Sequence, residues 1–132
     1  MTTVLVRAGL THTVGEVERL VAGFREHRDE VDAVLILDEG QLLADLPLFD
    51  LVAHPDDQLI ADVLVEEGHP EPLTVTVEAT VAEVAEQLVE NRRSSLLVVD
   101  ETGAPLGRIL ADDVVDALLP ERSRFHFPRL LQ

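Results

Sequence analysis

The sequence contains no cysteine, tryptophan or tyrosine, and aromatic residues make up only 3% of its 132 residues. The absence of cysteine excludes disulfides, thiol catalysis and cysteine-based zinc sites. Because aromatics are rare, the core must be packed from Val, Leu, Ile and Ala, and a hydrophobic content of 46% is enough for this. Apolar runs such as residues 33–37 are far shorter than the ~18 residues of a membrane helix, and the N-terminus carries no secretory signal. We therefore expect a cytoplasmic protein with no direct membrane insertion.

Lysine is also absent, so all ten basic residues are arginine, and 26 acidic residues give a net charge of −16. An acidic surface repels phosphate backbones, which argues against a nucleic-acid partner. The same surface attracts cations, including divalent metals. The alternative is that the acidity only keeps the protein soluble.

Catalytic motifs are missing. The sequence has no G-x-S-x-G, no P-loop and no G-x-G-x-x-G, and nothing pairs a nucleophile with a base. No two histidines have the H-x₃-H spacing of a zinc site; they are His12, His27, His54, His69 and His126. We therefore expect a protein that is not an enzyme.

Two stretches of the chain are similar to each other. The segment THTVGEVERLVAGF (11–24) matches EATVAEVAEQLVEN (78–91) at an offset of 67 positions, and Asp50 matches Asp113 at an offset of 63. The small drift places the length differences in loops, where they are tolerated. The chain is therefore predicted to contain two copies of one unit.

Each copy has the pattern strand, helix, strand, strand, helix. A T-x-x-E capping box begins each first helix, at Thr13 and at Thr80. The nearly continuous apolar runs 33–38 and 94–100 predict strands that are buried on both faces. Neither copy, at about 60 residues, buries enough surface to be stable alone. We predict an α/β fold in which two β-α-β-β-α repeats pack sheet against sheet with pseudo-two-fold symmetry.

The expected organisation has four parts. They are a first repeat at 1–53, a linker with a short helix at 54–72, a second repeat at 73–120 and a basic, aromatic tail at 121–132. We expect the tail to dock on its own module, on a dimer mate or on a neighbouring domain. A helix face that includes Val17, Leu20 and Val21 predicts a homodimer, because a two-layer module covers such a face poorly.

The stretch VVDETGAPLGRILADDVVDAL (98–118) resembles the pattern VVDxxGxLxGxITxxDhhxxL of CBS (cystathionine-β-synthase) domains, and the whole chain resembles a tandem CBS pair. The stretch LILDEGQLLADLPLFDLVAHPDDQLIADVL (35–64) is similar to the CBS region of MgtE-type magnesium transporters. The resemblance implies regulation and a flat dimeric disc. It also implies that the ligand is AMP or ATP between the repeats, or Mg²⁺ on acidic side chains.

By this resemblance, Asp50 and Asp113 bind the ribose hydroxyls of a nucleotide, and the helix N-terminus beside them holds phosphate. Gly107 and Arg108 complete the second of these sites. The alternative is that each aspartate only offsets its helix dipole, and that Arg108 is a surface residue.

The family pattern has Ser or Thr three residues before the aspartate, where this sequence has Pro47 and Leu110. The family glycine is present as Gly107 but is Ala44 in the first copy. Both nucleotide sites are therefore expected to be weakened, and the first more than the second.

Clustered carboxylates are the expected metal ligands. Asp112, Asp113 and Asp116 share one helical neighbourhood, and Asp56 and Asp57 lie in the linker. Hard cations such as Mg²⁺ take a few carboxylates and several waters. The alternative is a solvated acidic face.

The sequence as a whole predicts a regulatory module that senses Mg²⁺ or an adenine nucleotide and is linked to magnesium transport. Its expected partners are a second copy of itself and a transporter or an N-terminal domain. The alternative is a ligand-free structural dimerisation module of a larger protein.

Overall fold

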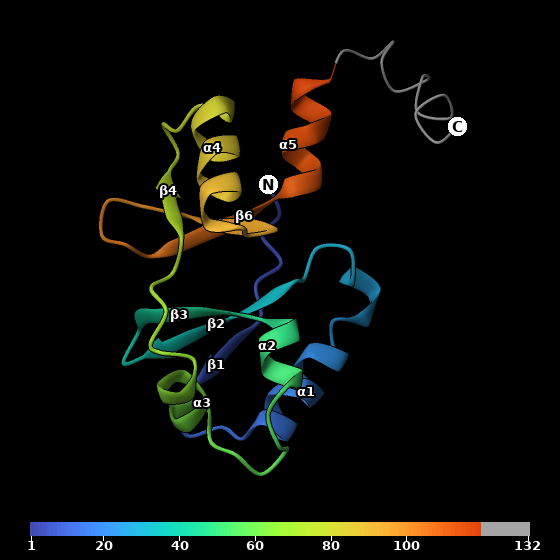
Figure 1. The fold of residues 1–132 in the computed structure, drawn as a ribbon, viewed down its shortest axis with the longest axis vertical. Helices are drawn as coiled ribbons and strands as arrows, with labels where there is room; N and C mark the ends of the chain where they lie inside the picture. The colour runs from blue at the N-terminus through green and yellow to red at the C-terminus, as the bar shows by residue number, and fades with distance from the viewer. Residues whose placement is uncertain (120–132) are drawn as a thin grey trace.

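The computed structural model describes residues 1–119, and the expected tail at 121–132 lies outside this part. Two units of the same construction follow each other along the chain (Figure 1). The first unit consists of β1 (Arg7–Gly9), α1 (Val14–Ala22), a 3-10 helix η1 (Arg25–His27), β2 (Ala33–Asp38), β3 (Gln41–Pro47) and α2 (Leu48–Val52). After α3 (Ile60–Glu66), the second unit consists of β4 (Thr74–Thr76), α4 (Val81–Asn91), β5 (Ser95–Val99), β6 (Pro105–Leu110) and α5 (Ala111–Leu118). The mixed α/β fold with two repeats is confirmed.

Each unit has its own three-stranded sheet, in the order β1-β2-β3 or β4-β5-β6. The first strand is parallel to the second, and the third is antiparallel to it. The hairpin register shifts after Ile36 in the first sheet and after Val98 in the second. These two residues are equivalent positions of the repeat, so even the bulge is repeated.

The capping residues begin both long helices. Thr13 Oγ1 accepts from the Glu16 N–H at 3.2 Å, and Glu16 Oε1 accepts from the Thr13 N–H at 3.3 Å, which completes a capping box. Thr80 Oγ1 accepts from the Glu83 N–H at 3.1 Å in the same way. The T-x-x-E pattern therefore marks where α1 and α4 start.

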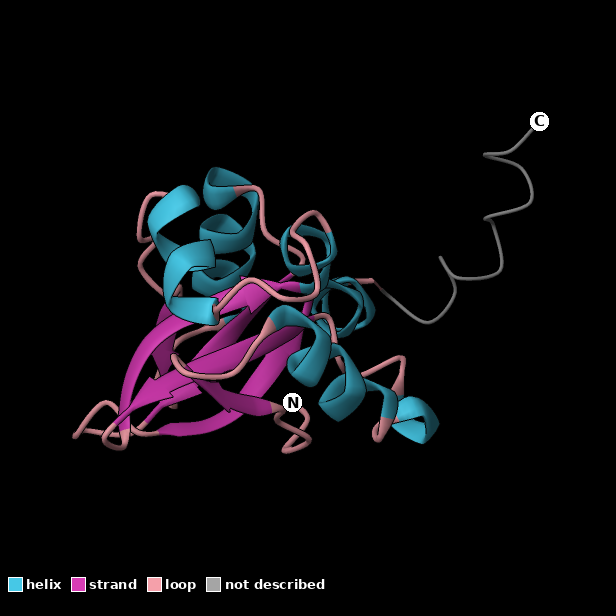
Figure 2. Cartoon of the chain, turned by 90° about the horizontal axis from the view of Figure 1, so that it is seen from below, coloured by secondary structure: helices cyan, strands magenta, loops and turns pink. Residues whose placement is uncertain are grey.

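The two sheets face each other, with the helices of each unit on the outer side (Figure 1), and they overlap when the molecule is seen from below (Figure 2). Leu5, Leu35 and Leu97 form a buried cluster that contains residues of both units. Near the N-terminus, Thr2 forms an antiparallel bridge with Arg108, with N–H···O distances of 2.9 and 2.8 Å. The start of the first repeat is thus hydrogen-bonded to the sheet of the second.

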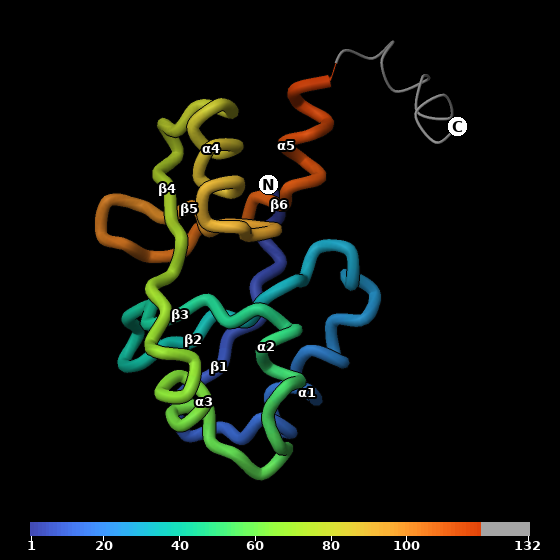
Figure 3. The backbone as a smooth tube through the Cα atoms, in the orientation of Figure 1, coloured from blue at the N-terminus to red at the C-terminus, as the bar shows by residue number. Residues whose placement is uncertain are grey.

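The cores of the two units differ. Figure 3 shows the backbone passing from α2 through a loop to α3, which packs on the first unit, before it continues to β4. Three residues of α3 are buried in the core of the first unit: Ile60, Val63 and Leu64. The core of the second unit consists of Val84, Leu88, Leu96 and Val114, with partly buried residues around them. The linker therefore covers the first repeat.

One expectation about the surface is wrong. Val17, proposed as part of an exposed helix face, has an exposed fraction of 0%. It packs in the core of the first unit, because the side of α1 that carries Val14 and Val17 faces this core. Of the three residues of that face, Leu20 is exposed, and Val21 is only partly buried against the core.

Candidate functional site

Asp113 lies in the first turn of α5, as the sequence predicts. Its carboxylate accepts from the Leu110 N–H at 3.3 Å, and the Met1 amino nitrogen lies 3.9 Å from Asp113 Oδ2. Leu110 is the N-cap residue of the helix, and a leucine side chain has no atom that accepts a hydrogen bond. Asp113 therefore supplies one half of a capping box. The other half, a hydroxyl at position 110 that accepts from a first-turn N–H, would need a Ser or Thr.

Beside Asp113 is a small pocket of about 160 Å³. Apart from Asp113, the residues that line it are apolar: Met1, Ala79, Val81, Val84, Ile109, Val114 and Ala117. Sites for drug-sized ligands have volumes of ~300–1,000 Å³. An adenine nucleotide therefore does not fit this pocket unless the Met1 side chain moves.

Gly107 is needed for the close approach of the N-terminal segment. A Cβ at this position would lie 2.8 Å from Thr2 O and 2.7 Å from the Met1 sulfur. Real Cβ atoms do not approach other atoms so closely. The glycine thus makes room for the chain itself at the place where the family resemblance implies a ligand.

Arg108 is buried, with an exposed fraction of 1%. Its guanidinium donates to Asp45 Oδ1 at 2.6 Å, to Asp45 Oδ2 at 2.7 Å and to Ser95 Oγ at 2.8 Å. The alternative of a surface arginine is therefore wrong. Because the two oxygens of Asp45 accept from the two terminal nitrogens of the guanidinium, the charge of Arg108 is neutralised within the protein.

The ion pair belongs to a larger polar network between the repeats. Arg93 Nη2 lies 3.3 Å from Asp45 Oδ2, and the carboxylate of Asp32 accepts from the hydroxyls of Ser94 and Ser95 at 2.6 and 2.7 Å. Asp32 also lies 3.6 Å from Arg108. Residues of the first repeat supply both carboxylates, and residues of the second supply the donors. The network therefore holds the two repeats in one relative position.

Sequence reasoning missed this network, although a signal was present. Asp45 and Arg108 are 63 residues apart, the same offset as Asp50 and Asp113, and each interrupts an otherwise apolar strand. A charge of opposite sign at the same repeat position indicates a pair across a pseudo-two-fold axis.

Asp50 lies in α2 after Pro47, at the place equivalent to Asp113. Pro47 is the N-cap residue, and no side chain caps this helix. α2 has five residues whereas α5 has eight. The helix at the first site is thus shorter than the helix at the second, and no side chain caps its N-terminus.

The expected metal ligands fall into two separate groups. Asp112, Asp113 and Asp116 are exposed on α5, whereas Asp56 and Asp57 are exposed in the loop between α2 and α3. These two elements lie at opposite ends of the molecule (Figure 1). Within residues 1–119, no group of three or more Asp, Glu or His side chains is arranged to hold a metal ion. The structure therefore does not bring the two groups together.

His54 joins the end of α2 to the end of α3. Its Nδ1 lies 3.0 Å from Glu66 Oε2 and 3.3 Å from Gln58 Oε1, and its Nε2 lies 2.9 Å from Glu67 Oε1. The hydrogen bond to Glu67 is the main cause that raises the pKa of His54, and burial opposes it. A protonated imidazole donates from both nitrogens, so it suits this position better than a neutral one.

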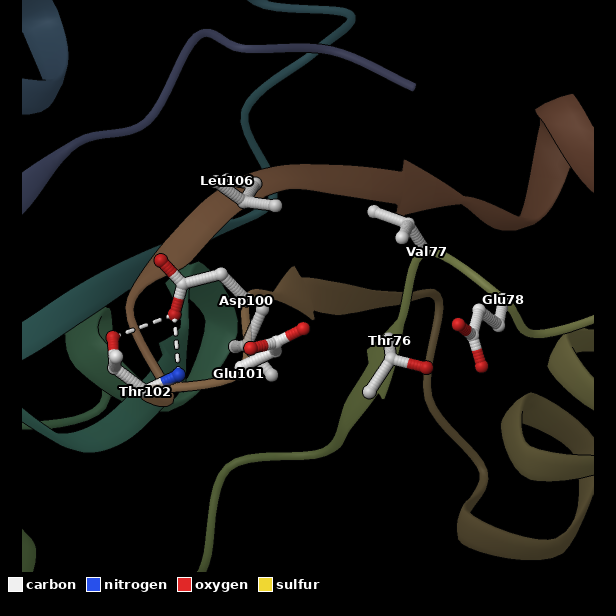
Figure 4. A pocket seen from close by; sticks show the side chains of 8 residues that line it. Thr76, Val77, Glu78, Asp100, Glu101, Thr102 and Leu106 are labelled. Carbon is white, nitrogen blue, oxygen red and sulfur yellow. Dashed lines mark hydrogen bonds between the residues drawn. The ribbon is translucent and has the colours of Figure 1, made fainter.

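A larger, open pocket of about 540 Å³ lies at the end of the second sheet (Figure 4). Val77 and Leu106 supply apolar surface, and Glu78 and Glu101 supply carboxylates. Asp100 accepts from the Thr102 hydroxyl at 2.7 Å. This bond, together with backbone N–H donors, lowers the pKa of Asp100.

The fold and the site define a class of protein: a module of two α/β repeats that are joined by a buried ion pair. The family model of the CBS domain matches residues 60–120. Residues 60–120 are therefore similar to a CBS domain, and the two-repeat fold of the chain is that of a CBS-domain pair.

Several solved structures are similar to most of the chain. The cytosolic domain of the Mg²⁺ channel MgtE, solved in complex with ATP, has 28% sequence identity and a TM-score of 0.76, over 86% of this chain and 45% of that chain. The soluble part of a magnesium transporter has 22% identity and a TM-score of 0.75, over 89% and 44%. A CBS domain pair/ACT domain protein from Thermotoga maritima has 19% identity and a TM-score of 0.65, over 89% and 90%.

The chain spans less than half the length of the first two of these structures. No curated protein sequence matches it. In the part of the chain from residue 1 to residue 119, no helix has the length and apolarity to span a membrane.

Proposed function

We infer that the chain is a regulatory module of a magnesium-transport system and that it responds to Mg²⁺. The observation that supports this most is the 28% identity to the cytosolic domain of a Mg²⁺ channel over 86% of this chain. The proposed role is regulatory and requires no catalytic group.

The proposed Mg²⁺ ligands are the carboxylates at the two ends of the molecule. Asp112 and Asp116 are four residues apart on α5 and share a face, and Asp56 and Asp57 are neighbours in the loop before α3. Mg²⁺ keeps several waters and needs only one or two carboxylates, so each pair is sufficient for a weak site. Binding would also relieve the repulsion within a chain of net charge −16.

An adenine nucleotide is proposed as a weaker ligand, at the pocket beside Asp113. The pocket of about 160 Å³ must open by displacement of Met1. Gly107 lies under the segment that would move, and the charge of Arg108 is already neutralised by Asp45. Asp113 is therefore the residue left to bind ribose. At the first site, Asp50 follows Pro47, which has no hydroxyl and no N–H.

A second copy of the chain is the proposed partner. Val89, Val115 and Leu118 on α4 and α5 have exposed fractions of 76%, 50% and 55%. With Leu88 and Val114 they line an apolar groove between the two helices. Contact between two such faces would remove this apolar surface from water. A transporter or an N-terminal domain remains the proposed target of regulation.

A second candidate function is a structural module without a ligand. Two observations favour it: Met1 of the chain itself narrows the Asp113 pocket to about 160 Å³, and a buried ion pair joins the repeats. Such a module would still dimerise, but it would not respond to Mg²⁺.

The test is a thermal melt in MgCl₂ and in NaCl of matched ionic strength. A ligand at ten times its Kd stabilises the folded protein by about 1.4 kcal/mol, which raises Tm by a few degrees in a domain of this size. The Mg²⁺-specific part should disappear in Asp112→Asn with Asp116→Asn. It should persist in Glu86→Gln with Glu90→Gln, which removes the same charge at the same spacing from α4. Equal shifts in both salts would support the structural module.

A further inference from the structure

The corner between β1 and α1 is covered by the chain that follows α2. Val14 N–H donates to Gln58 O and Gly15 N–H to Asp56 O, both at 2.9 Å. In return, the N–H groups at the start of α3 donate to carbonyls of the corner: Ile60 to His12 O at 2.9 Å and Ala61 to Leu10 O at 3.1 Å. We call residues 56–66 the covering segment. Because it covers the corner, Val14 has an exposed fraction of 0%.

The corner between β4 and α4 has the same construction. Ala79 N–H donates to Thr76 O at 3.1 Å, as His12 N–H donates to Gly9 O at 3.3 Å. Thr80 then caps α4 as Thr13 caps α1. The residues of this second corner, 76–82, thus have counterparts 67 positions earlier.

The two corners differ in their cover. Val81, the counterpart of Val14, has an exposed fraction of 44%, and Val77, the counterpart of Leu10, has one of 71%. No segment among residues 1–119 makes the backbone hydrogen bonds that residues 56–61 make to the first corner. The second corner also borders the open pocket of Figure 4, which Val77 and Leu106 both line.

The position of the missing cover in the chain follows from the repeat. In the first unit, three residues separate the end of α2 at Val52 from the covering segment at Asp56. In the second unit, α5 ends at Leu118, and residues 120–132 follow after Leu119. Thirteen extended residues span up to about 43–47 Å, which is ample for the same return to the corner.

The composition of residues 120–132 suits the second corner. The segment carries apolar residues that could replace Ile60, Val63 and Leu64: Phe125, Phe127, Leu130 and Leu131. It has three arginines against one acid, Glu121. The corner and its pocket are acidic, with Glu78, Glu83, Asp100 and Glu101. The segment is therefore complementary to the second corner in charge, and it carries apolar residues to cover the exposed valines.

We propose that residues 120–132 bind the β4–α4 corner of the same chain, in the place that the covering segment occupies on the first repeat. This docking completes the core of the second unit. It needs neither Mg²⁺ nor nucleotide, so it stands independently of the proposed function.

Amide hydrogen exchange tests whether the corner is covered. In the full chain, the Val81 and Ala82 amides should be protected as Val14 and Gly15 are. Deletion of residues 120–132 should make Val81 and Ala82 exchange about tenfold faster or more, with Val14 and Gly15 unchanged as internal controls. Replacement of Arg122, Arg124 and Arg129 by Glu should release the corner in a chain of full length. Exchange at Val81 and Ala82 that is the same in all three proteins would overturn the proposal.

Disulfide trapping tests which chain supplies the segment. The protein has no cysteine, so Val77→Cys can be combined with a single cysteine at position 125, 127 or 131. At least one pair should close within one chain, at a rate independent of protein concentration. The control replaces Val77→Cys by Leu20→Cys, an exposed residue of the first repeat, and should not close. Disulfides only between chains, or equal closure in the control, would overturn the proposal.

Discussion

Asp45 and Arg108 occupy the same position in the two repeats and bind each other, with Asp45 Oδ1 2.6 Å from Arg108 Nη2. A single repeat position therefore carries a carboxylate in one copy and a guanidinium in the other. Both side chains are almost fully buried, at 0% and 1% exposure. Arg93 lies beside Asp45, and Asp32 lies beside Arg108. The two halves of the pair are thus equivalent in the fold but not in their surroundings.

Arg108→Met should destabilise the protein by about 3–5 kcal/mol, because Asp45 would remain buried with less compensation. Asp45→Leu in the same chain should recover most of this loss, since a matched apolar pair avoids the uncompensated charge. Urea unfolding of the two single variants and the double variant measures the coupling. Additive losses would show that the pair does not act as a unit.

Exchange of the two charges tests the asymmetry of their surroundings. In Asp45→Arg with Arg108→Asp, the new arginine would lie beside Arg93 and the new aspartate beside Asp32. We therefore expect the exchanged protein to be less stable than the native one by at least about 1 kcal/mol, from two like-charge contacts with little solvent. Equal stability in urea would contradict this account of the network.

Gly107→Ala should destabilise the protein by about 1–3 kcal/mol, the usual effect of overpacking. The reason is the 2.8 Å distance that its Cβ would have to Thr2 O. The control is the same substitution in a chain that lacks residues 1–3, where it should have almost no effect. An equal loss of stability in the full chain and in the shortened chain would show that Thr2 is not the cause of the clash.

Leu110→Thr should stabilise α5 relative to Leu110→Val by about 1 kcal/mol. Threonine and valine are similar in size and are both branched at Cβ, so their difference isolates the hydroxyl that would accept from a first-turn N–H. Thermal unfolding of the two variants measures it. Identical Tm values would show that Asp113 already satisfies the N-terminus.

His54 should make the stability of the linker depend on pH. Its folded-state pKa is raised above the ordinary value of about 6.5, so its contribution is fully present below that value. The contribution is lost as the pH rises through the folded-state pKa. His54→Asn should therefore cost most at pH 5–6, on the order of 1 kcal/mol for charge-assisted hydrogen bonds, and progressively less at higher pH.

Urea unfolding of both proteins from pH 5 to 9 measures this difference. Asp100, whose pKa is lowered, titrates far below this range and does not contribute. A difference between the proteins that is constant over the range would show that His54 contributes packing and no charge.

Much of the fold could be predicted because its signals are local. The T-x-x-E boxes at Thr13 and Thr80 begin α1 and α4, and the apolar runs form β2 and β5. Burial was harder to predict, because it depends on residues far away in the sequence. Arg108 was expected at a nucleotide site or at the surface, since its neighbours do not reveal that Asp45 is its partner. Val17 was expected in an exposed face because helical periodicity does not say which side meets the sheet.

The candidate site shows the same limit. Asp113 lies where the repeat predicts it, but no local pattern shows that Met1 and Thr2 reach the second repeat. The carboxylates of α5 and of the linker were predicted as two clusters, but the sequence could not show that they lie at opposite ends of the molecule.

The bridge between Thr2 and Arg108 has a consequence for the order of events during synthesis. The two residues are separated by 106 positions, so at ~5–20 residues per second the partner of Thr2 is made about 5–20 s after it. During this interval the first repeat can already fold around its own core and α3, before Thr2 has its partner. We expect the pairing of Thr2 with Arg108 to form late, because contacts between residues so far apart in the sequence form slowly. Thr2 is therefore made well before its partner and is among the last residues to take its final place.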